Sequence, residues 1–174
     1  AFDGTTTATI ADATRLGPAA KLAVADDGSG AMLWELGGFD AIVTSLGTGG
    51  AYAVPVSGIA RWRGGRQVRG PSGFDAQVTA IATYDAGAGP EILSTGFFSS
   101  AGAVPTNAIA KWDGNSWNGS TAFTGGLSGS GAALTEWDDG GGASLFVGGT
   151  FTAAGGVSAQ SIAKWDGVSF SPLG

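Results

Sequence analysis

The sequence contains no cysteine and no histidine among its 174 residues. Without cysteine there is no disulfide framework, and thiol usage gives no information about the redox compartment. Without histidine, the commonest general base and the commonest metal ligand are both missing. These two absences argue against most hydrolytic and metal-dependent mechanisms, and we expect a protein that is not an enzyme.

Charged residues are also scarce, at 13%, and 14 Asp and Glu outnumber eight Lys and Arg. Nucleic acid is therefore not an expected partner, because phosphate binding requires a basic surface. No apolar run approaches the ~20 residues of a membrane-spanning helix. Apolar residues nevertheless make up 43% of the chain, and 33 glycines lie among them. This composition predicts a folded domain rather than a disordered chain.

What the chain does contain is an internal repeat. The segment AIAKWDGNSW (108–117) returns 53 positions later as SIAKWDGVSF (161–170). Around it, GGTFTAAGGVSAQSIAKWDG (148–167) aligns without a gap on TGFFSSAGAVPTNAIAKWDG (95–114). A more divergent copy precedes these two and ends in VPVSGIARWRGG (54–65). A period of about 50 residues is typical of propeller blades.

Each copy is predicted to form four short strands. In the middle copy they are QVTAIATY (77–84), EILSTGFF (91–98), AIAKW (108–112) and NSWNG (115–119). The Asp-Gly pair between the last two predicts a type I′ hairpin turn, in which both central residues have positive φ. No segment shows a sustained 3.6-residue apolar period. We therefore predict an all-β, propeller-like fold of four-stranded antiparallel blades, with a solenoid of stacked hairpins as the alternative.

The repeats divide a single domain that covers residues 1–174. The opening AFDGTTTATI resembles the last strand of a repeat whose other strands are absent. Between Phe39 and Trp62 the first repeat is nine residues longer than the others. This insertion at 40–53 is predicted to be a loop, and the stretch VTSLGTGGAYAVPV (43–56) is apolar, Gly-rich and uncharged. In order, the parts are a leading strand at 1–10 and repeats at 11–64, 65–114 and 115–174.

The last copy carries the repeat pattern most completely, through Gly148, Gly149, Phe151, Ala154, Gly155, Gly156, Ile162, Ala163, Trp165, Asp166 and Gly167. This pattern resembles the repeat of secreted bacterial β-propeller proteins, which are kelch-like or WD-type in architecture. The resemblance covers most of residues 24–174. It implies a secreted or surface-exposed protein, but propellers host many unrelated activities, so it implies no particular function.

Aromatic residues recur in register along the repeats. We expect the recurring set to fill the space between neighbouring blades, because aromatic side chains bury large areas. That set is Trp62, Trp112 and Trp165 with Phe39, Phe98 and Phe151. The other tryptophans are less constant in type from copy to copy. Aromatic rings near turns also stack on sugars, which leaves a carbohydrate-binding function open.

Acidic residues recur in Asp/Gly-rich turns. Asp26-Asp27, Asp85 and Asp138-Asp139 occupy matching places, and recurrence in every copy indicates a turn role rather than a catalytic one. Calcium is the one metal that such turns could hold, since carboxylates are hard oxygen ligands. The D-x-[DN]-x-[DN]-G pattern of a calcium loop is absent. We therefore expect no cofactor, with Ca²⁺ as the open alternative.

Three repeats are too few to close a propeller of 4–8 blades. We expect copies of the chain to pair through blade edges or the leading strand, unless that strand folds back on its own blade. The basic stretch RWRGGRQVRG (61–70) is either a solvated hairpin with spread charges or a patch that docks on an acidic turn of another copy, such as Asp138-Asp139. The candidate subunit contacts are Phe2, Thr5, Thr7, Leu46, Tyr52, Arg61, Arg63, Arg66, Arg69, Asp138 and Asp139.

The sequence therefore predicts a non-catalytic extracellular structural protein that self-assembles into a ring or a filament. The alternative is a carbohydrate- or protein-binding propeller module, part of a longer chain. Asn118-Gly119-Ser120 is a formal N-glycosylation sequon, relevant only in a host that modifies it.

Overall fold

The computed structural model describes residues 13–16, 19–38, 41–45, 51–55, 58–64, 66–68, 73–102, 104–119, 123, 125–138 and 140–173. Within these ranges all regular secondary structure is β-strand, and no helix occurs. The predicted all-β class is confirmed. Its physical basis is the alternation of apolar and polar residues in short runs separated by Asp/Gly turns.

Three four-stranded antiparallel sheets form the body of the described chain. The first sheet contains β2 (Ala19–Ala25), β3 (Met32–Gly37), β6 (Ile59–Arg63) and β7 (Arg66–Val68). The second sheet contains β8 (Val78–Tyr84), β9 (Glu91–Gly96), β12 (Ile109–Trp112) and β13 (Trp117–Asn118). The third sheet contains β14 (Ser130–Asp138), β15 (Ala143–Thr150), β18 (Ile162–Trp165) and β19 (Phe170–Pro172).

The strand after each Trp-containing turn pairs with the strand before that turn. Lys111 pairs with Asn118, and Lys164 pairs with Ser171 in the same register of the next sheet. The first sheet therefore extends to Val68 and the second to Asn118. Each Trp-containing turn lies inside a sheet, a few residues before the sheet ends.

A small hairpin is inserted between the second and third strands of each large sheet. In the second sheet it is β10 (Ser100–Ala101) with β11 (Val104–Pro105), and in the third sheet β16 (Ala153–Ala154) with β17 (Val157–Ser158). In the first sheet the same place is taken by β4 (Ala41–Ser45) and β5 (Ala51–Pro55), and β1 (Ala13–Leu16) pairs with β4.

The prediction of a loop for the insertion at 40–53 is therefore wrong for residues 41–45 and 51–53. The inserted residues lengthen a hairpin that the other repeats also possess. The residues at 41–45 and 51–53 carry no charge and include β-branched Ile42, Val43 and Thr44, so they satisfy their backbone groups more readily by strand pairing than as an isolated loop.

The first strand of each sheet carries a β-bulge at the same place. The pairing shifts between Ala19 and Lys21, between Val78 and Ala80, and between Gly131 and Ala133. Bulges increase the local right-handed twist of a strand. The repeat seen in the sequence is thus reproduced in an irregular backbone feature.

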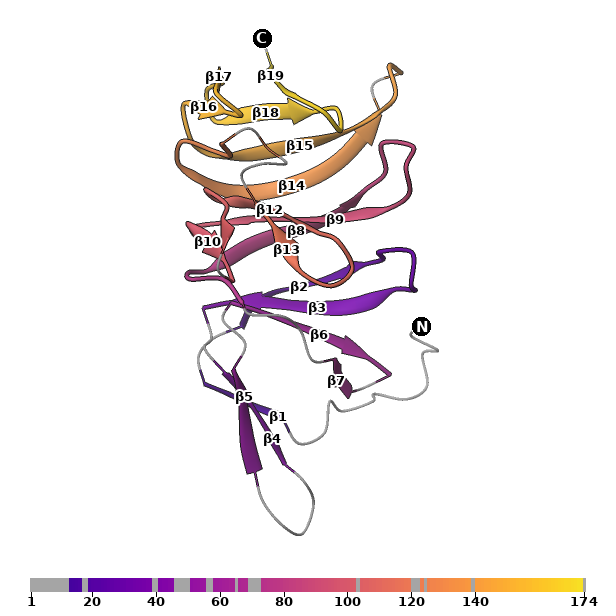
Figure 1. Cartoon of the computed structure of the whole chain (residues 1–174), viewed down its shortest axis with the longest axis vertical. Coiled ribbons are helices and arrows are strands. Elements are labelled where there is room, and N and C mark those ends of the chain that lie inside the picture. Colours follow the sequence, from indigo (N-terminus) through magenta and orange to yellow (C-terminus); the bar gives the residue numbers. More distant parts are fainter. Residues whose placement is uncertain are drawn as a thin grey trace.

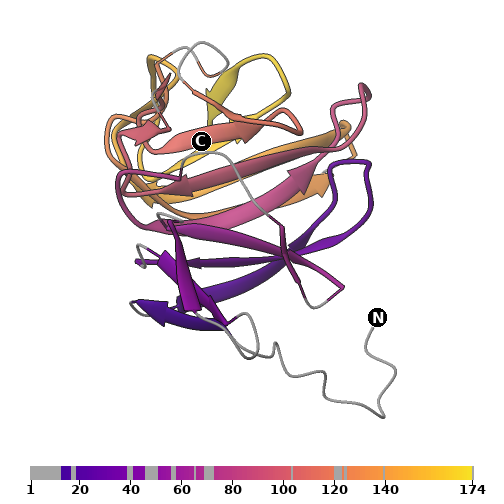
Figure 2. The ribbon, with the colours of Figure 1, turned by 60° about the horizontal axis from the view of Figure 1, so that its bottom comes forward.

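The sheets pack face to face in sequence order. Strand β8 contacts β2 and β3, and β14 contacts β8 and β9. Figure 1 shows the first sheet (indigo to purple), the second (magenta to salmon) and the third (orange to yellow) one above another. In the turned view of Figure 2 the first sheet lies lowest, and the second and third sheets overlap above it.

Aromatic side chains fill both spaces between the sheets. Between the first and second sheets, Trp34 meets Trp112 edge-on with ring centroids 6.1 Å apart. Between the second and third sheets lie the rings of Trp165 and Phe170, both from the third sheet, with their centroids 4.8 Å apart. These two clusters form the core, in which large aromatic rings pack with aliphatic side chains.

Each sheet has two chemically distinct faces, because successive residues of a strand point to opposite sides. We call the face that carries Trp62, Trp112 or Trp165 the Trp face. The opposite face carries the preceding residue of the same strand, Arg61, Lys111 or Lys164, and we call it the basic face. The Trp face of the second sheet packs on the basic face of the first, and the third sheet packs likewise on the second.

Candidate binding cleft

The first and second sheets are joined at their turn ends by a hydrogen bond. Nε1 of Trp112 donates to Oδ2 of Asp27 at 3.2 Å. Two hollows of about 390 and 350 Å³ flank this pair and together form the candidate binding cleft. Asp27 and Gly114 line both hollows. The larger hollow is also lined by Pro90, Glu91, Lys111 and Trp112. The smaller hollow is also lined by Ser29, Met32, Arg61 and Arg63.

The turn that holds Asp27 follows a D-x-G-x-G pattern. Oδ1 of Asp26 accepts hydrogen bonds from the backbone N–H groups of Gly28 and Gly30. Both glycines have positive φ, at 87° and 108°, a conformation that side chains disfavour. Asp26 therefore fixes the turn and leaves the next residue, Asp27, directed at the second sheet.

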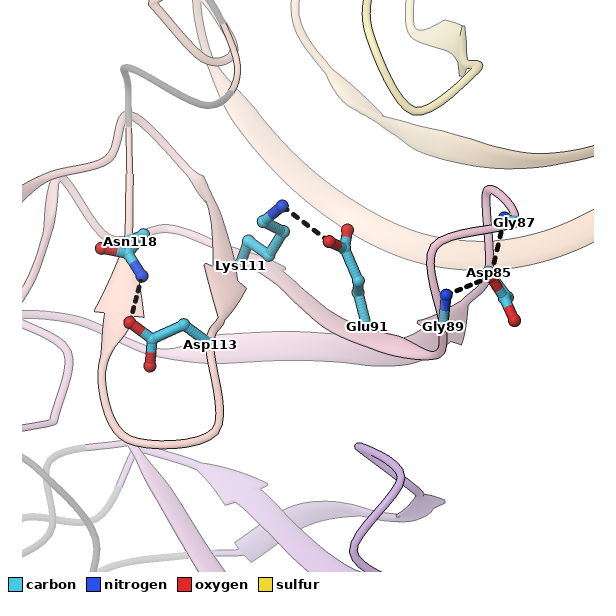
Figure 3. Close-up of polar contacts among 7 residues, drawn as sticks. All are labelled: Asp85, Gly87, Gly89, Glu91, Lys111, Asp113 and Asn118. Atoms are coloured by element: carbon cyan, nitrogen blue, oxygen red, sulfur yellow. Dashed lines mark hydrogen bonds and ion pairs between the residues drawn. The ribbon is translucent and has the colours of Figure 1, made fainter.

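The same turn occurs in the other two sheets. Asp85 accepts from the N–H groups two and four residues later, and Asp138 does the same. Figure 3 shows the Asp85 turn. The predicted turn role is thus confirmed for Asp26, Asp85 and Asp138, whose carboxylates serve the backbone.

Asp27 differs from these three because it also reaches across to another sheet. Its carboxylate accepts from the backbone N–H and the hydroxyl of Ser29 as well as from Trp112. Partial burial opposes its ionisation, but the hydrogen bonds from Ser29 and Trp112 outweigh burial and lower the pKa of Asp27. Asp27 thus presents a fixed negative charge inside the cleft.

The Trp-Asp-Gly turns are also fixed by their aspartates. Asp113 accepts from the backbone N–H groups of Ser116 and Asn115 and from the side-chain amide of Asn118, and these bonds lower its pKa. Asp166 is held in the same way, by Ser169 and Val168.

The predicted type I′ geometry is wrong for these turns. Asp113 N–H bonds the carbonyl of Ser116, so Gly114 and Asn115 are the central residues of the turn. Of the two, only Gly114 has positive φ, at 94°, as in type II′ turns. The aspartate therefore precedes the centre of the turn and acts as its hydrogen-bond acceptor.

An ion pair lines one side of the cleft. Nζ of Lys111 lies 2.8 Å from Oε1 of Glu91 on the neighbouring strand (Figure 3). Both side chains are about one-third exposed. The pair neutralises two charges at the mouth of the hollow, and such a partly exposed pair adds little to stability.

The two arginines nearest the cleft are engaged within the chain. Nη2 of Arg63 donates to the carbonyls of Ser29 and Gly30 and to the Ser29 hydroxyl, each at 3.0 Å. The Arg61 guanidinium lies 4.8 Å from the ring centre of Trp112. Both side chains thus hold neighbouring elements together, and docking of the basic hairpin on another copy stays a prediction.

The other predicted contacts are only partly visible. Asp138 is exposed at the end of β14, while Tyr52 in β5 and Arg66 in β7 are described by their backbone alone. Phe2, Thr5, Thr7, Leu46, Arg69 and Asp139 lie outside the described residues.

The recurring aromatic positions are all buried where the structure describes them, namely Trp62, Trp112, Trp165, Phe98 and Phe151. Phe39 lies outside the described residues. Trp62 differs from Trp112 in one respect, because its indole N–H is buried without a hydrogen-bond partner. A buried donor that lacks an acceptor costs about 1–3 kcal/mol.

Sequence analysis missed an exposed aromatic patch on the basic face of the third sheet. The ring centroids of Trp137 and Phe146 are 5.7 Å apart. Nζ of Lys164 lies 6.0 Å from the centroid of the Phe146 ring. Ile162 is exposed on the same face. The register of Trp137 with Tyr84 in the repeat was the available signal, but the repeat alone did not reveal which face each residue occupies.

The charged groups around the cleft are engaged within the chain. Its carboxylates accept hydrogen bonds from turn residues and from Trp112, or pair with Lys111. In the described part of the chain no three His, Cys, Asp or Glu residues gather where they could hold a metal ion.

Comparisons with protein-family models, with curated proteins and with solved structures give no match to this chain. None of the described segments forms a helix of the length and hydrophobicity needed to cross a membrane. The class of protein is therefore defined by the fold itself, as an all-β chain of packed antiparallel sheets.

Proposed function

We propose that this chain is a propeller-like repeat protein with a non-catalytic, structural role outside the cell, where copies assemble into a ring or filament. The observation that carries the proposal is the patch on the basic face of the third sheet. Trp137 and Ile162 are exposed there, although the equivalent face of the second sheet is buried. Exposed apolar residues gathered on one face of a protein often mark the surface that contacts another protein molecule.

The propeller-like interpretation is supported by the order of the strands. In each large sheet the four strands lie side by side in the order in which they occur in the sequence. One small hairpin is inserted between the second and third strands. The first strands β2, β8 and β14 contact one another in sequence order. Propeller blades share this arrangement, and three blades fall short of the 4–8 in a closed ring.

The non-catalytic and extracellular parts of the proposal rest mainly on the sequence. A chain without histidine or cysteine has few routes to general base or nucleophilic catalysis. The location follows from the resemblance to secreted propeller repeats. The proposed function involves no cofactor. The aspartates that could have held Ca²⁺, in the D-x-G-x-G turns, already accept hydrogen bonds from the backbone.

Light scattering coupled to size-exclusion chromatography tests the assembly. The chain has a mass of 17.0 kDa, so oligomers are resolved from a monomer with ease. We expect a mass that rises with protein concentration, and rings or filaments in negative-stain micrographs. A mass of 17.0 kDa at every concentration, with small uniform particles, would contradict the proposal.

The cleft supports a second candidate function, a carbohydrate- or protein-binding module. It combines the Trp112 ring, the Asp27 carboxylate and two hollows of about 390 and 350 Å³. Such a module would bind immobilised glycans as a monomer, and Asp27→Ala would abolish the binding. A glycan array without hits, together with concentration-dependent assembly, would favour the structural role.

A further inference from the structure

The two interfaces between the sheets use equivalent positions. Trp112 of the second sheet packs on Trp34 of the first, and Trp165 of the third sheet joins the cluster that contains Leu93 of the second. Trp34 and Leu93 occupy the same position of the repeat, and Phe146 is their equivalent in the third sheet. One packing arrangement is thus used twice.

Within the described residues, no sheet packs on the basic face of the third sheet. Tyr84 is 0% exposed in the second sheet, whereas its equivalent Trp137 is 59% exposed in the third. Ile109 is 0% exposed, whereas its equivalent Ile162 is 41% exposed. The side chains remain apolar at both positions, although nothing in the described part of the chain covers them.

The Trp face of the first sheet shows the complementary pattern. Ile81 on the Trp face of the second sheet is 9% exposed, whereas its equivalent Leu22 in the first sheet is 61% exposed. Val24, on the same face, is exposed as well. Trp62, Ala60 and Glu35 on this face are buried within the chain, so the exposed part of the face is the β2 strand with Leu22 and Val24.

We propose that the Trp face of the first sheet of one copy packs on the basic face of the third sheet of the next copy. This inference rests on the self-assembly proposed above and identifies the surfaces that join. It places Leu22 and Val24 of one copy against the patch of Trp137 and Ile162 of its neighbour. The contact repeats between copies the arrangement that already joins consecutive sheets within the chain.

The charges on these faces fit the same arrangement. Arg61 on the basic face of the first sheet lies 4.8 Å from the Trp112 ring of the next sheet. Lys164 is its equivalent on the third sheet, so the basic face of that sheet carries a cation at the same position.

The two surfaces differ from each other, so the contact is head to tail. Such contacts form closed rings or open filaments, depending on the rotation between copies. A two-fold contact through the third sheet alone would use Trp137 and Ile162 without involving Leu22. The two arrangements therefore respond differently to a change at Leu22.

Two variants, each blocking one surface, test the inference. Leu22→Glu places a charge on the Trp face of the first sheet, and Ile162→Glu places one on the basic face of the third. Val168→Glu is the matched control, because Val168 is an exposed apolar residue in the turn between β18 and β19. Thermal unfolding of all three variants checks that each one is folded.

We expect each blocked variant to remain at 17.0 kDa while the control assembles like the unaltered chain. An equimolar mixture of the two blocked variants retains one intact surface of each kind. It is expected to form a dimer of about twice the monomer mass and nothing larger.

The outcomes separate this inference from the proposed function. If the unaltered chain assembles and both blocked variants assemble equally well, the inference is wrong while self-assembly stands. If only Ile162→Glu prevents assembly, the contact is two-fold and the head-to-tail arrangement is wrong. If the unaltered chain stays monomeric, both self-assembly and the inference are wrong.

Discussion

Trp112 donates its indole N–H to the carboxylate of Asp27, which lies 85 positions earlier in the chain. The bond links two sheets at the point where both hollows of the cleft meet. Asp27 is held by Ser29, so the acceptor is already oriented when the second sheet packs. The bond therefore adds directional specificity to an interface otherwise made of aliphatic side chains and of edge-on or tilted aromatic rings.

A double-mutant cycle measures the strength of this bond. We expect Asp27→Ala and Trp112→Phe to show a coupling energy of about 1–2 kcal/mol, because a hydrogen bond to a charged group is lost in either variant. Urea-induced unfolding of the four proteins gives the value. The same cycle with Trp165→Phe, in the other aromatic cluster, is the control, and a coupling as large there would refute the assignment.

The D-x-G-x-G turn of the second sheet provides a matched pair of variants. Asp85→Ala removes the acceptor for two backbone N–H groups and is expected to lower the free energy of unfolding by about 1–2 kcal/mol. Asp85→Asn keeps a side-chain oxygen at the same place and is expected to cost less than half as much. Chemical denaturation measures both, and equal losses would show that the charge matters rather than the acceptor geometry.

Stability is expected to fall in acid because of the aspartates of the Trp-Asp-Gly turns. The pKa values of Asp113 and Asp166 are lowered in the folded chain by backbone N–H donors, from an ordinary value of 3.8. A lowered folded-state pKa stabilises the fold above the ordinary pKa, and this stabilisation is lost as the pH falls through the folded-state value.

The double variant Asp113→Asn/Asp166→Asn tests this dependence. We expect it to be less stable than the unaltered chain at about pH 7 and to lose less stability between about pH 5 and about pH 2. The two denaturation curves should therefore converge in acid. Parallel curves over the whole range would show that other carboxylates, such as Asp75, dominate the acid response.

Close approach between sheets makes Gly131 intolerant of a side chain. A Cβ at Gly131 would lie 2.8 Å from Cβ of Thr95 in the second sheet and would clash with its hydroxyl. Gly131→Ala is therefore expected to cost about 1–3 kcal/mol through overpacking. At Gly148 the nearest atom would be 4.0 Å away, so Gly148→Ala should be close to neutral in the same unfolding assay.

The repeat and the turns could be predicted from the sequence because both depend on local chemistry. An Asp followed by glycines at +2 and +4 specifies its own turn, whichever surroundings it has. The strands follow from short apolar runs between such turns. This is why the aspartates of the three D-x-G-x-G turns were assigned correctly without knowledge of the fold.

Contacts between segments far apart in the sequence could not be predicted, because they depend on which strands pair and which faces meet. Arg63 replaces the aspartate of the other repeats, and from the sequence it is simply an exposed cation. Its partners, Ser29 and Gly30, lie more than 30 positions upstream and reach it only through the pairing of β3 with β6. The insertion at 40–53 was also misjudged: its two ends pair with each other as β4 and β5, and β1 pairs with β4.

The fixed direction of packing, with each Trp face on the preceding sheet, has a consequence for synthesis on the ribosome. When the strand that contains Trp112 leaves the ribosome, the first sheet, on which it packs, has already been synthesised. The same holds for Trp165 and the second sheet. The chain can therefore add sheets in the order of translation without a long wait for distant partners. Vectorial folding of this kind shortens the time during which the most aggregation-prone residues are exposed.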